Sequence, residues 1–561
     1  MSTNRRDAVL GTVYGGVCAL FFTLGQMLEQ KGGLAVPSAA EGAVFLLIWA
    51  VCGFLCVRIW RRMDRKREKK SSCCGAGVRE TDEASRAEKR RNAVLLWLLF
   101  FLLQLISLLA VYPGFFVYDA AEELAMVQTR SFTTHHPLLH VLALGGTILG
   151  VHKVTGSYNL GIFCYLLLQM AAMDAVFVCL VREMGAAAPK RRGGIAKWFG
   201  ILWLALCPVV TMFVLCSCKD GLFAAALLML VLYLKRLFLG DVTRRNAAGC
   251  IVSGTLMMLL RNNGAYAYAV FLILAGAALG VKRVKAREHV SSGRGWRIAV
   301  ILLLPLFLYK GASSGLAAAL HADSSESQEI LTVPIMQLAR VWISDPDSFT
   351  AEETVLMQEL MAPADGEETN GLLGWDYYNP VLSDQVKLRF RSDVYRSDPG
   401  TFWKLWLTKG REHPAAYLNA WLMTSYGFWA PGTVIDCYKG NTVYTFTYGE
   451  SSYFGYETEL PGTRQSKLPA LDTWYRFLSL DAAAQRLPVL SWILSPGVMA
   501  LAFAFCGVYL LRQRRRRLLL AWFPLFLVWL TVLLGPCALP RYVVYLWIGL
   551  PCIVADAWRA A

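Results

Sequence analysis

Residues 93–111 read AVLLWLLFFLLQLISLLAV, and residues 112–140 continue as YPGFFVYDAAEELAMVQTRSFTTHHPLLH. The first stretch contains no charged residue and is long enough, as a helix, to cross the ~30 Å hydrocarbon core of a bilayer. The second stretch places three acidic residues and three histidines directly after this apolar segment. Acidic and imidazole side chains at that depth predict chemistry at a membrane surface.

The composition places the whole chain in the polytopic membrane class. Hydrophobic residues make up 56% of the 561 residues and the mean hydropathy is +0.43, above the usual values for a soluble chain. We therefore predict an all-α polytopic membrane protein with about twelve transmembrane helices. The expected spans are 8–29, 41–59, 93–111, 159–181, 196–214, 221–237, 248–261, 266–281, 298–318, 492–511, 518–535 and 541–558.

The distribution of charge predicts the orientation. The formal net charge is +16, and 32 of the 56 lysines and arginines lie in five short segments between expected spans. An excess of basic residues in short loops is typical of the cytoplasmic side, so the charge is explained without a nucleic-acid partner. Residues 319–490 hold 13 basic and 22 acidic residues, and we expect them on the extracytoplasmic side. The five basic segments are 61–92, 182–197, 235–247, 282–297 and 512–517.

The number of crossings constrains residues 138–151. Because the basic segments 61–92 and 182–197 must face the same side, the chain crosses an even number of times between them. The 14 residues of 138–151 would span only about 21 Å as a helix, short of the ~30 Å core. We interpret them as a re-entrant or interfacial helix, which leaves both termini cytoplasmic in a plasma-membrane protein.

This topology divides the chain into four parts. Residues 319–490 form the expected extracytoplasmic domain, α-rich or mixed, in which 400–428 has helical character and 431–468 has the composition of loops or short strands. The other parts are two N-terminal transmembrane helices with a basic cytoplasmic loop (1–92), a transmembrane core with the first outer loop at 112–137 (93–318), and the C-terminal transmembrane helices (491–561).

Ionisable and polar groups recur where the expected spans reach the outer side. They are Asp119 with the histidines, Lys219-Asp220, Arg261-Asn262-Asn263 and Arg541-Tyr542. Such groups beside membrane spans indicate a functional site, and we expect them to meet in one extracytoplasmic cavity. The alternative for each is a snorkelling or capping residue at a helix end.

Short motifs follow one another in a recognisable order: Tyr112-Pro113-Gly114, Tyr118-Asp119, His136-Pro137-Leu138, Lys219-Asp220, residues 333–340, His413-Pro414, residues 426–429 and Arg541-Tyr542. In order and membrane side, the pattern resembles the GT-C superfamily of integral-membrane glycosyltransferases. It is most similar to an uncharacterised bacterial membrane-protein family related to the protein mannosyltransferase and aminoarabinose transferase families. The resemblance covers residues 93–558, which leaves the first two spans as an addition to a GT-C-like core.

The resemblance implies transfer of a sugar from a polyprenyl-phosphate-linked donor to a glycan, lipid or protein acceptor on the extracytoplasmic face. In such families an acidic residue of the first outer loop is catalytic or positions the acceptor, and Asp119 holds that place. Asp220 matches a second acidic site, although Lys-Asp replaces the acid-arginine pattern of relatives. We thus predict that the catalytic residues are Asp119, Asp220 and His136. The predicted donor-phosphate-binding residues are Arg261, Lys219 and Arg541. The predicted substrate-binding residues are Tyr118, Glu122, His135, Asn263 and Tyr542.

Such a reaction needs a base for the acceptor and cations for the departing phosphate, to which arginine donates two hydrogen bonds at once. Two interpretations of His135 and His136 stay open. In the first, the two histidines are metal ligands beside Asp119 and Glu122. In the second, they donate hydrogen bonds that orient the loop and the sugar. The spacing requires no metal; the oxygen ligands of a divalent ion would be Asp119 and Asp220.

Other functions compete with the transferase. A transporter or a flippase for lipid-linked glycans also needs about twelve spans and a lipid-phosphate site, but we find no internal repeat that indicates one. An outer-face polysaccharide ligase or polymerase shares the donor and differs mainly in the acceptor. A scaffold role gives no reason for ionisable groups at four outer span ends.

Overall fold

The computed structural model describes residues 3–71, 82–186, 190–286, 292–324, 327–362, 371–434 and 458–558. These residues form helices and three isolated β-bridges, with no strand among them. Seven of the described helices are long and apolar enough to cross a membrane. An eighth crossing arises if α7 (Lys190–Leu206) and α8 (Pro208–Val214), which are bent by 58° at their junction, form one span. The predicted class of all-α membrane protein is therefore confirmed.

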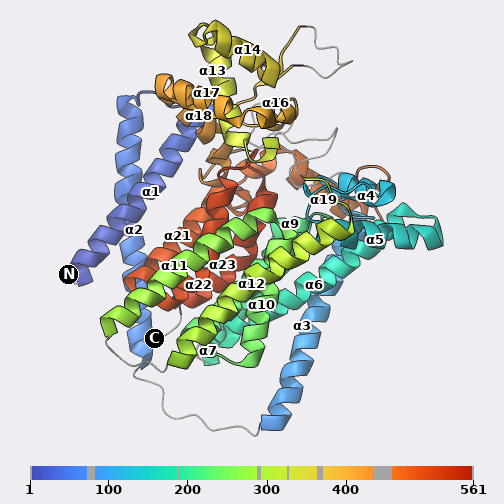
Figure 1. Ribbon diagram of the computed structural model, residues 1–561. Coiled ribbons are helices and arrows are strands. Elements are labelled where there is room, and N and C mark those ends of the chain that lie inside the picture. Colours follow the sequence, from blue (N-terminus) through green and yellow to red (C-terminus); the bar gives the residue numbers. More distant parts are fainter. Residues whose placement is uncertain are drawn as a thin grey trace.

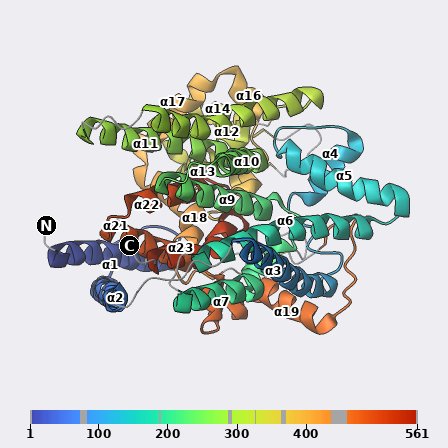
Figure 2. The same ribbon diagram turned by 90° about the horizontal axis from the view of Figure 1, so that it is seen from below.

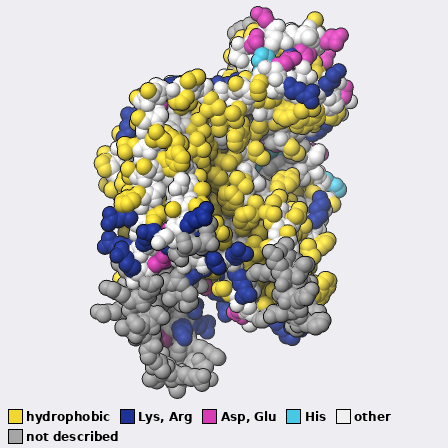
Figure 3. Space-filling model, turned by 90° about the vertical axis from the view of Figure 1, so that its left-hand side faces the viewer, with side chains coloured by type: hydrophobic (Ala, Val, Ile, Leu, Met, Phe, Trp, Pro, Cys, Tyr) yellow, Lys and Arg dark blue, Asp and Glu magenta, His cyan; other side chains and the backbone are white. Residues whose placement is uncertain are grey.

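The long helices run between two ends of a membrane body (Figure 1). At the basic end, Glu183 near the end of α6 pairs with Lys235 and Arg236 near the end of α9. The opposite end, where α9 begins at Lys219, is called the site end. Figure 3 shows a broad hydrophobic band between the two. The helices are α1 (Thr3–Lys31), α2 (Ala39–Ser71), α3 (Asp82–Ala110), α6 (Tyr158–Ala186), α7 with α8, α9 (Lys219–Leu239), α10 (Arg244–Leu260), α11 (Asn262–Ala286), α12 (Ser292–Ala319), α21 (Pro496–Arg512), α22 (Arg516–Val532) and α23 (Val544–Trp558).

Helices α1 and α2 lie at one edge of the body, away from α5 (Figure 2). They approach each other closely through glycine, because a Cβ atom on Gly15 would lie 2.5 Å from the Trp49 carbonyl oxygen and 2.9 Å from the Gly53 Cα. Small residues at such crossings let two helix backbones meet within a bilayer. The pair is thus a peripheral hairpin, whereas α9 is buried along most of its length among α6, α10, α22 and α23.

A second, smaller body stands above the site end in Figure 1. Its apolar core gathers around α13, with Ile335 and Trp375 fully buried and the Trp375 indole donating to the Met357 carbonyl at 2.7 Å. The helical character predicted for 400–428 is confirmed by α17 and α18. The helices of this outer body are α13 (Thr332–Ser344), α14 (Ala351–Leu360), α15 (Asp384–Lys387), α16 (Ser392–Ser397), α17 (Pro399–Glu412) and α18 (Pro414–Ser425).

The rest of segment 319–490 packs on the membrane body. In α19 (Pro469–Leu480), the Tyr475 hydroxyl donates to Ser107 of α3 at 2.8 Å. Of the predicted loop-or-strand region 431–468, residues 435–457 lie outside the described residues, and 458–468 contain no strand. The described part of segment 319–490 is therefore helical rather than mixed, and it divides between the two bodies.

Helix α5 (Leu138–Thr155) ends four residues later than expected. At 18 residues its length of about 27 Å would allow it to cross, so the expected end at residue 151 and the length argument built on it are wrong. The contacts of α5, however, place both of its ends at the site end. His140 near its start bonds to Tyr165 of α6 at 2.7 Å, and His152 near its end stacks on Tyr158 at 3.7 Å. Both ends of α5 thus lie beside the first two turns of α6, at the site end with α4 (Ala120–Thr129) (Figures 1 and 2).

Buried ion pairs hold the helices together at the basic end. The Lys235 ammonium lies 2.8 Å from a carboxylate oxygen of Asp556 in α23, and both side chains are 1% exposed. The Trp522 indole donates to the same carboxylate at 2.8 Å. A charge taken out of water must be paired, so these contacts set the relative height of α9, α22 and α23.

We expect Lys235→Met to lower the free energy of unfolding by about 3–5 kcal/mol, because it leaves the Asp556 carboxylate buried without its cation. Thermal unfolding in detergent measures the change. The double variant Lys235→Met/Asp556→Leu should recover most of the loss, and Arg516→Gln, an exposed arginine of the same end, should change little. Equal loss in the single and double variants would contradict the assignment.

Candidate functional site

The site begins with a backbone clamp between two distant segments. The Phe115 amide donates to the Leu215 carbonyl at 3.1 Å, and the Ser217 amide donates to the Phe115 carbonyl at 3.0 Å. Since α9 begins two residues after Ser217, the clamp sets the loop of Asp119 beside Lys219. A third segment of the chain joins the clamp, because the Glu459 amide donates to the Phe116 carbonyl at 2.7 Å.

Asp119 is the residue on which the cations of the site converge. It precedes α4 in the N-cap position, but its carboxylate makes no capping bond. Instead, one oxygen lies 2.5 Å from the Lys219 ammonium and the other accepts from the Arg541 guanidinium at 3.2 Å. Burial alone would raise the pKa of Asp119, but Arg541, Lys219 and His136 hold it well below its usual value. The carboxylate is therefore ionised at neutral pH.

Tyr118 supports this arrangement at a cost in backbone strain. Its φ of +62° is uncommon for a residue with a side chain, and its ring is 2% exposed beneath the Arg541 guanidinium, 4.4 Å from ring centre to Cζ. Such outliers persist where the surroundings enforce them, and they cluster at functional sites.

A second layer lies behind Asp119. Glu123 follows Asp119 by four residues at the start of α4, so the two carboxylates share a side of that helix. His136 lies just before α5, and His140 lies in its first turn. Lys219 Nζ lies 3.3 Å from Glu123 Oε1 and 3.1 Å from His136 Nδ1. His140 bonds to Glu123 through Nδ1 and to the Tyr165 hydroxyl through Nε2. Burial would raise the pKa of Glu123, but His140 and Lys219 lower it.

A third group joins Arg541 to α9 and α10. Arg261, at the end of α10, bonds to Asp220, and its guanidinium lies 4.7 Å above the Tyr542 ring. The Arg541 Nε atom lies 4.0 Å from the other Asp220 oxygen. Arg541 and Arg261 thus flank the Tyr542 ring, and carboxylates on neighbouring elements balance their charge.

Exposure separates the residues that can meet a substrate from those that support them. Asp119, Arg261 and Glu122 have side chains that are 18%, 15% and 64% exposed. The side chains of Glu123, His136 and Arg541 are at most 6% exposed. The first three are therefore accessible from the site end, while the buried residues set their charge and position.

The geometry of the cluster tests whether its side chains can bind a divalent cation. Asp119, Glu123 and His136 present three ligand atoms within 4.8 Å of one another, a suitable set for a divalent cation. The Lys219 ammonium, however, lies within 3.3 Å of all three side chains. A metal ion at these atoms must displace Lys219. Asp220, the other predicted oxygen ligand, bonds to Arg261 instead.

Glu459 belongs to the site, although its sequence surroundings carry no signal. Its carboxylate accepts a bond from the Tyr118 backbone, and its Oε1 atom is buried with no partner among the described residues. Burial, opposed by that backbone bond and aided by the nearby Asp119 charge, raises the pKa of Glu459 to about 7. Glu459 is therefore a carboxyl group beside Asp119 whose pKa lies near neutral pH.

The structure brings most of the predicted residues together. Asp119, Lys219, Arg541, Asp220, Arg261, His136, Glu122, Tyr118 and Tyr542 form one continuous cluster. His135 is exposed and packs edge-on against His136 at 4.4 Å. Asn263 instead contacts α22, where it donates to Thr531 at 3.0 Å. The prediction missed the position of Glu123, which its four-residue spacing from Asp119 could have indicated, and those of His140 and Glu459.

Residues 117–561 match the family described as "Family of unknown function (DUF6020)". The chain belongs to the DUF6020 family. Neither the curated proteins nor the solved structures gave a match. The DUF6020 region begins two residues before Asp119 and contains every residue of the cluster, while α1, α2 and α3 precede it.

Removal of the Lys219 ammonium should open the cluster to divalent cations. In Lys219→Ala, Mn²⁺ should raise the melting temperature through coordination by Asp119, Glu123 and His136, whereas the wild type should not respond. Lys387→Ala, which removes a buried lysine of the outer body, is the control. A wild-type protein stabilised by Mn²⁺ and destabilised by EDTA would contradict this arrangement.

Glu459 predicts a pH dependence of stability. Because its folded pKa lies above the ordinary value, the native state binds an extra proton, and this contribution to stability is lost as pH rises from about 4.5 to 7. Glu459→Gln should therefore melt about 1–3 °C above the wild type at pH 8 and at nearly the same temperature at pH 4.5. A difference that does not change with pH would show that Glu459 titrates normally.

Proposed function

We propose that this protein is a plasma-membrane glycosyltransferase-like enzyme of GT-C type. It transfers a sugar from a polyprenyl-phosphate-linked donor to a glycan, lipid or protein acceptor on the extracytoplasmic face. The observation that carries the proposal is Asp119, an ionised carboxylate in a loop at the helix ends, held between Lys219 and Arg541. A partly exposed acid in this place is what activation of an acceptor at a membrane surface requires.

The proposed topology has twelve crossings, with the site end outside. The crossing elements are α1, α2, α3, α6, α7 with α8, α9, α10, α11, α12, α21, α22 and α23. Each of these helices has one end at the basic end of the body. There, Arg512 at the end of α21 pairs with Asp7 in α1 and Asp64 in α2. Positive charge around this end (Figure 3) supports a cytoplasmic location. Helix α5 does not cross and stays outside.

The carboxyl groups of the site have different roles in this proposal. Asp119 stays ionised and orients the acceptor hydroxyl or amine through a hydrogen bond. Glu459, with a pKa of about 7, takes the proton that the acceptor loses, because a catalytic base works best near the ambient pH. The bond from the sugar anomeric carbon to the phosphate oxygen breaks as the bond to the acceptor forms, and the polyprenyl phosphate leaves.

Arg261 is the proposed contact for the donor phosphate. It is the more exposed of the two arginines, and Asp220 and the Tyr542 ring fix the plane of its guanidinium. A guanidinium presents five N–H donors, so a phosphate can bind beside Asp220. Its position at a helix end near the interface suits a ligand whose phosphate is polar and whose tail stays in the bilayer.

A transporter or a flippase for lipid-linked glycans is the second candidate, and one buried residue favours it. Asp174 lies within α6, fully buried, and neither of its carboxylate oxygens has a hydrogen-bond partner among the described residues. Gln104 of α3 lies beside it. An ionisable group inside a span marks pathways for protons or ions in many transporters.

The test uses membranes that contain the full chain and a polyprenyl-phosphate-linked sugar found by lipid mass spectrometry of the purified protein. Asp119→Asn should reduce transfer at least about 100-fold while the donor still co-purifies, because it removes the charge that orients the acceptor and leaves Arg261 in place. Arg261→Gln should lose the co-purified donor. Glu352→Gln, an exposed acid of α14, is the control.

Full transfer by Asp119→Asn would refute the catalytic role of Asp119. Normal transfer by Asp174→Asn is expected for the enzyme. Movement of the lipid-linked sugar across vesicles without transfer, abolished by Asp174→Asn, would favour the transporter.

A further inference from the structure

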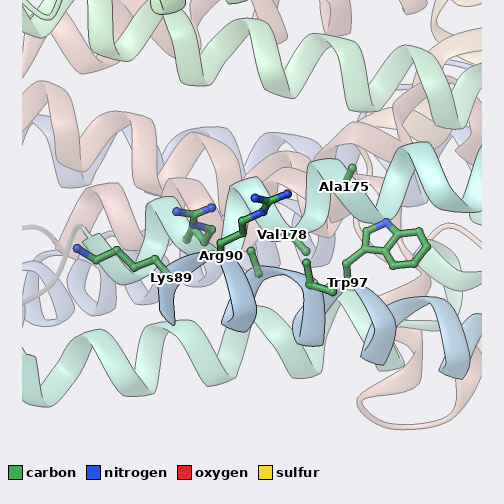
Figure 4. Close-up of a pocket in the computed structure, with 8 residues that line it drawn as sticks. Lys89, Arg90, Trp97, Ala175 and Val178 are labelled. Carbon is green, nitrogen blue, oxygen red and sulfur yellow. The ribbon is translucent and has the colours of Figure 1, made fainter. Parts of the chain in front are cut away.

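A groove of about 410 Å³ lies between α3 and α6, at the opposite end of these helices from Asp119 (Figure 4). Three cations line one part of it: Lys89, Arg90 and Arg182. The other part is walled by apolar side chains, among them Val178 and Trp97. Among the residues that the structure describes, no acidic side chain lines the groove.

The cations and the apolar wall are ordered along the helix axis. The two helices run in opposite directions, because α3 ends at the site end whereas α6 begins there and reaches the basic end at Glu183 (Figure 1). The Trp97 indole of α3 donates a hydrogen bond to the Ala171 carbonyl of α6. Lys89 and Arg90 lie about two turns before Trp97, and Arg182 lies about two turns after Ala175. Figure 4 accordingly shows the two basic side chains of α3 at one end of the groove and the Trp97 indole at the other. The groove therefore has a charged mouth at the basic end and an apolar floor that leads into the span.

These three cations differ from their neighbours at the basic end. Lys235, Arg236 and Arg512 pair with carboxylates of adjacent helices. Of the residues that the structure describes, none offers a carboxylate within ion-pair distance of Lys89, Arg90 or Arg182. Three exposed cations around one hollow thus retain charge for a ligand from outside the chain.

We propose that this groove binds an anionic phospholipid of the adjacent leaflet. The phosphate lies among Lys89, Arg90 and Arg182, and one acyl chain follows Val94 and Val178 toward Trp97. Basic pockets between transmembrane helices at the cytoplasmic side suit anionic headgroups, and indole rings favour the boundary between headgroup and hydrocarbon. The apolar floor favours a lipid over a free phosphate, because a free phosphate has no apolar part that could pack against it. The proposal does not depend on the transferase chemistry at the other end of the helices.

Native mass spectrometry of the full chain in detergent tests the proposal, with phosphatidylglycerol as the probe and phosphatidylcholine as the neutral comparison. Wild type should bind phosphatidylglycerol with clear preference. Arg90→Gln/Arg182→Gln should weaken this binding by roughly tenfold or more, since each cation near the surface adds attraction to the headgroup. The matched control is Arg516→Gln/Arg517→Gln, which removes two exposed arginines of α22 at the same end and should bind as the wild type does.

A second variant probes the apolar floor without changing charge. Ala175→Phe fills the groove below the cations at an exposed position, so it should also weaken phosphatidylglycerol binding while the melting temperature stays near that of the wild type. Equal binding by the Arg90/Arg182 variant and the control would overturn the proposal. Equal binding of the two lipids to the wild type would also overturn it. Full displacement of the lipid by millimolar inorganic phosphate would assign the groove to a free anion instead.

Discussion

The ion pairs of Asp119 with Lys219 and Arg541 join three segments that are far apart in the chain. One is the loop after α3, one is the start of α9, and one is the short 3₁₀ turn before α23. Each charge is largely withdrawn from water, so each is tolerated only because the others are present. The backbone clamp between Phe115 and Ser217, the strained Tyr118 and the covering segment at Glu459 all serve to keep these three groups in contact.

The same pairing limits what the cations of the site can do. Lys219 and Arg541 are occupied by Asp119 and Glu123, so their main effect is to keep Asp119 ionised and in place. Arg261 is more exposed and has one carboxylate partner, which leaves donors for an incoming anion. Lys219 also lies where a metal ion would bind, so a fixed internal cation balances the acidic residues.

The two ends of the membrane body handle charge differently. At the site end, acids and bases form one continuous and mostly buried cluster, in which Asp119, Arg261 and Glu122 are open to solvent. At the basic end, compact pairs such as Lys235 with Asp556 hold helices together, while the groove between α3 and α6 has three cations that pair with no carboxylate of the described residues. A broad apolar surface separates the ends (Figure 3), so interactions at one end cannot substitute for those at the other. The helices are thus held at the two ends of the body by different sets of residues.

Local sequence determined the class of this protein and the positions of most helices. A membrane-spanning helix needs a long apolar run, basic residues gather beside it, and both features can be read from neighbouring residues alone. It also pointed to Asp119, Lys219 and Arg541, since ionisable residues at span ends stand out against their apolar surroundings. Tertiary structure alone decided which of these residues meet. The partnership of Asp220 with Arg261 depends on the packing of α9 against α10. The contact of Asn263 with α22 and the position of Glu459 beside Tyr118 depend on packing between segments that are hundreds of residues apart. The position of α5 beside the start of α6 depends on the same packing, because its length and composition also suit a crossing helix.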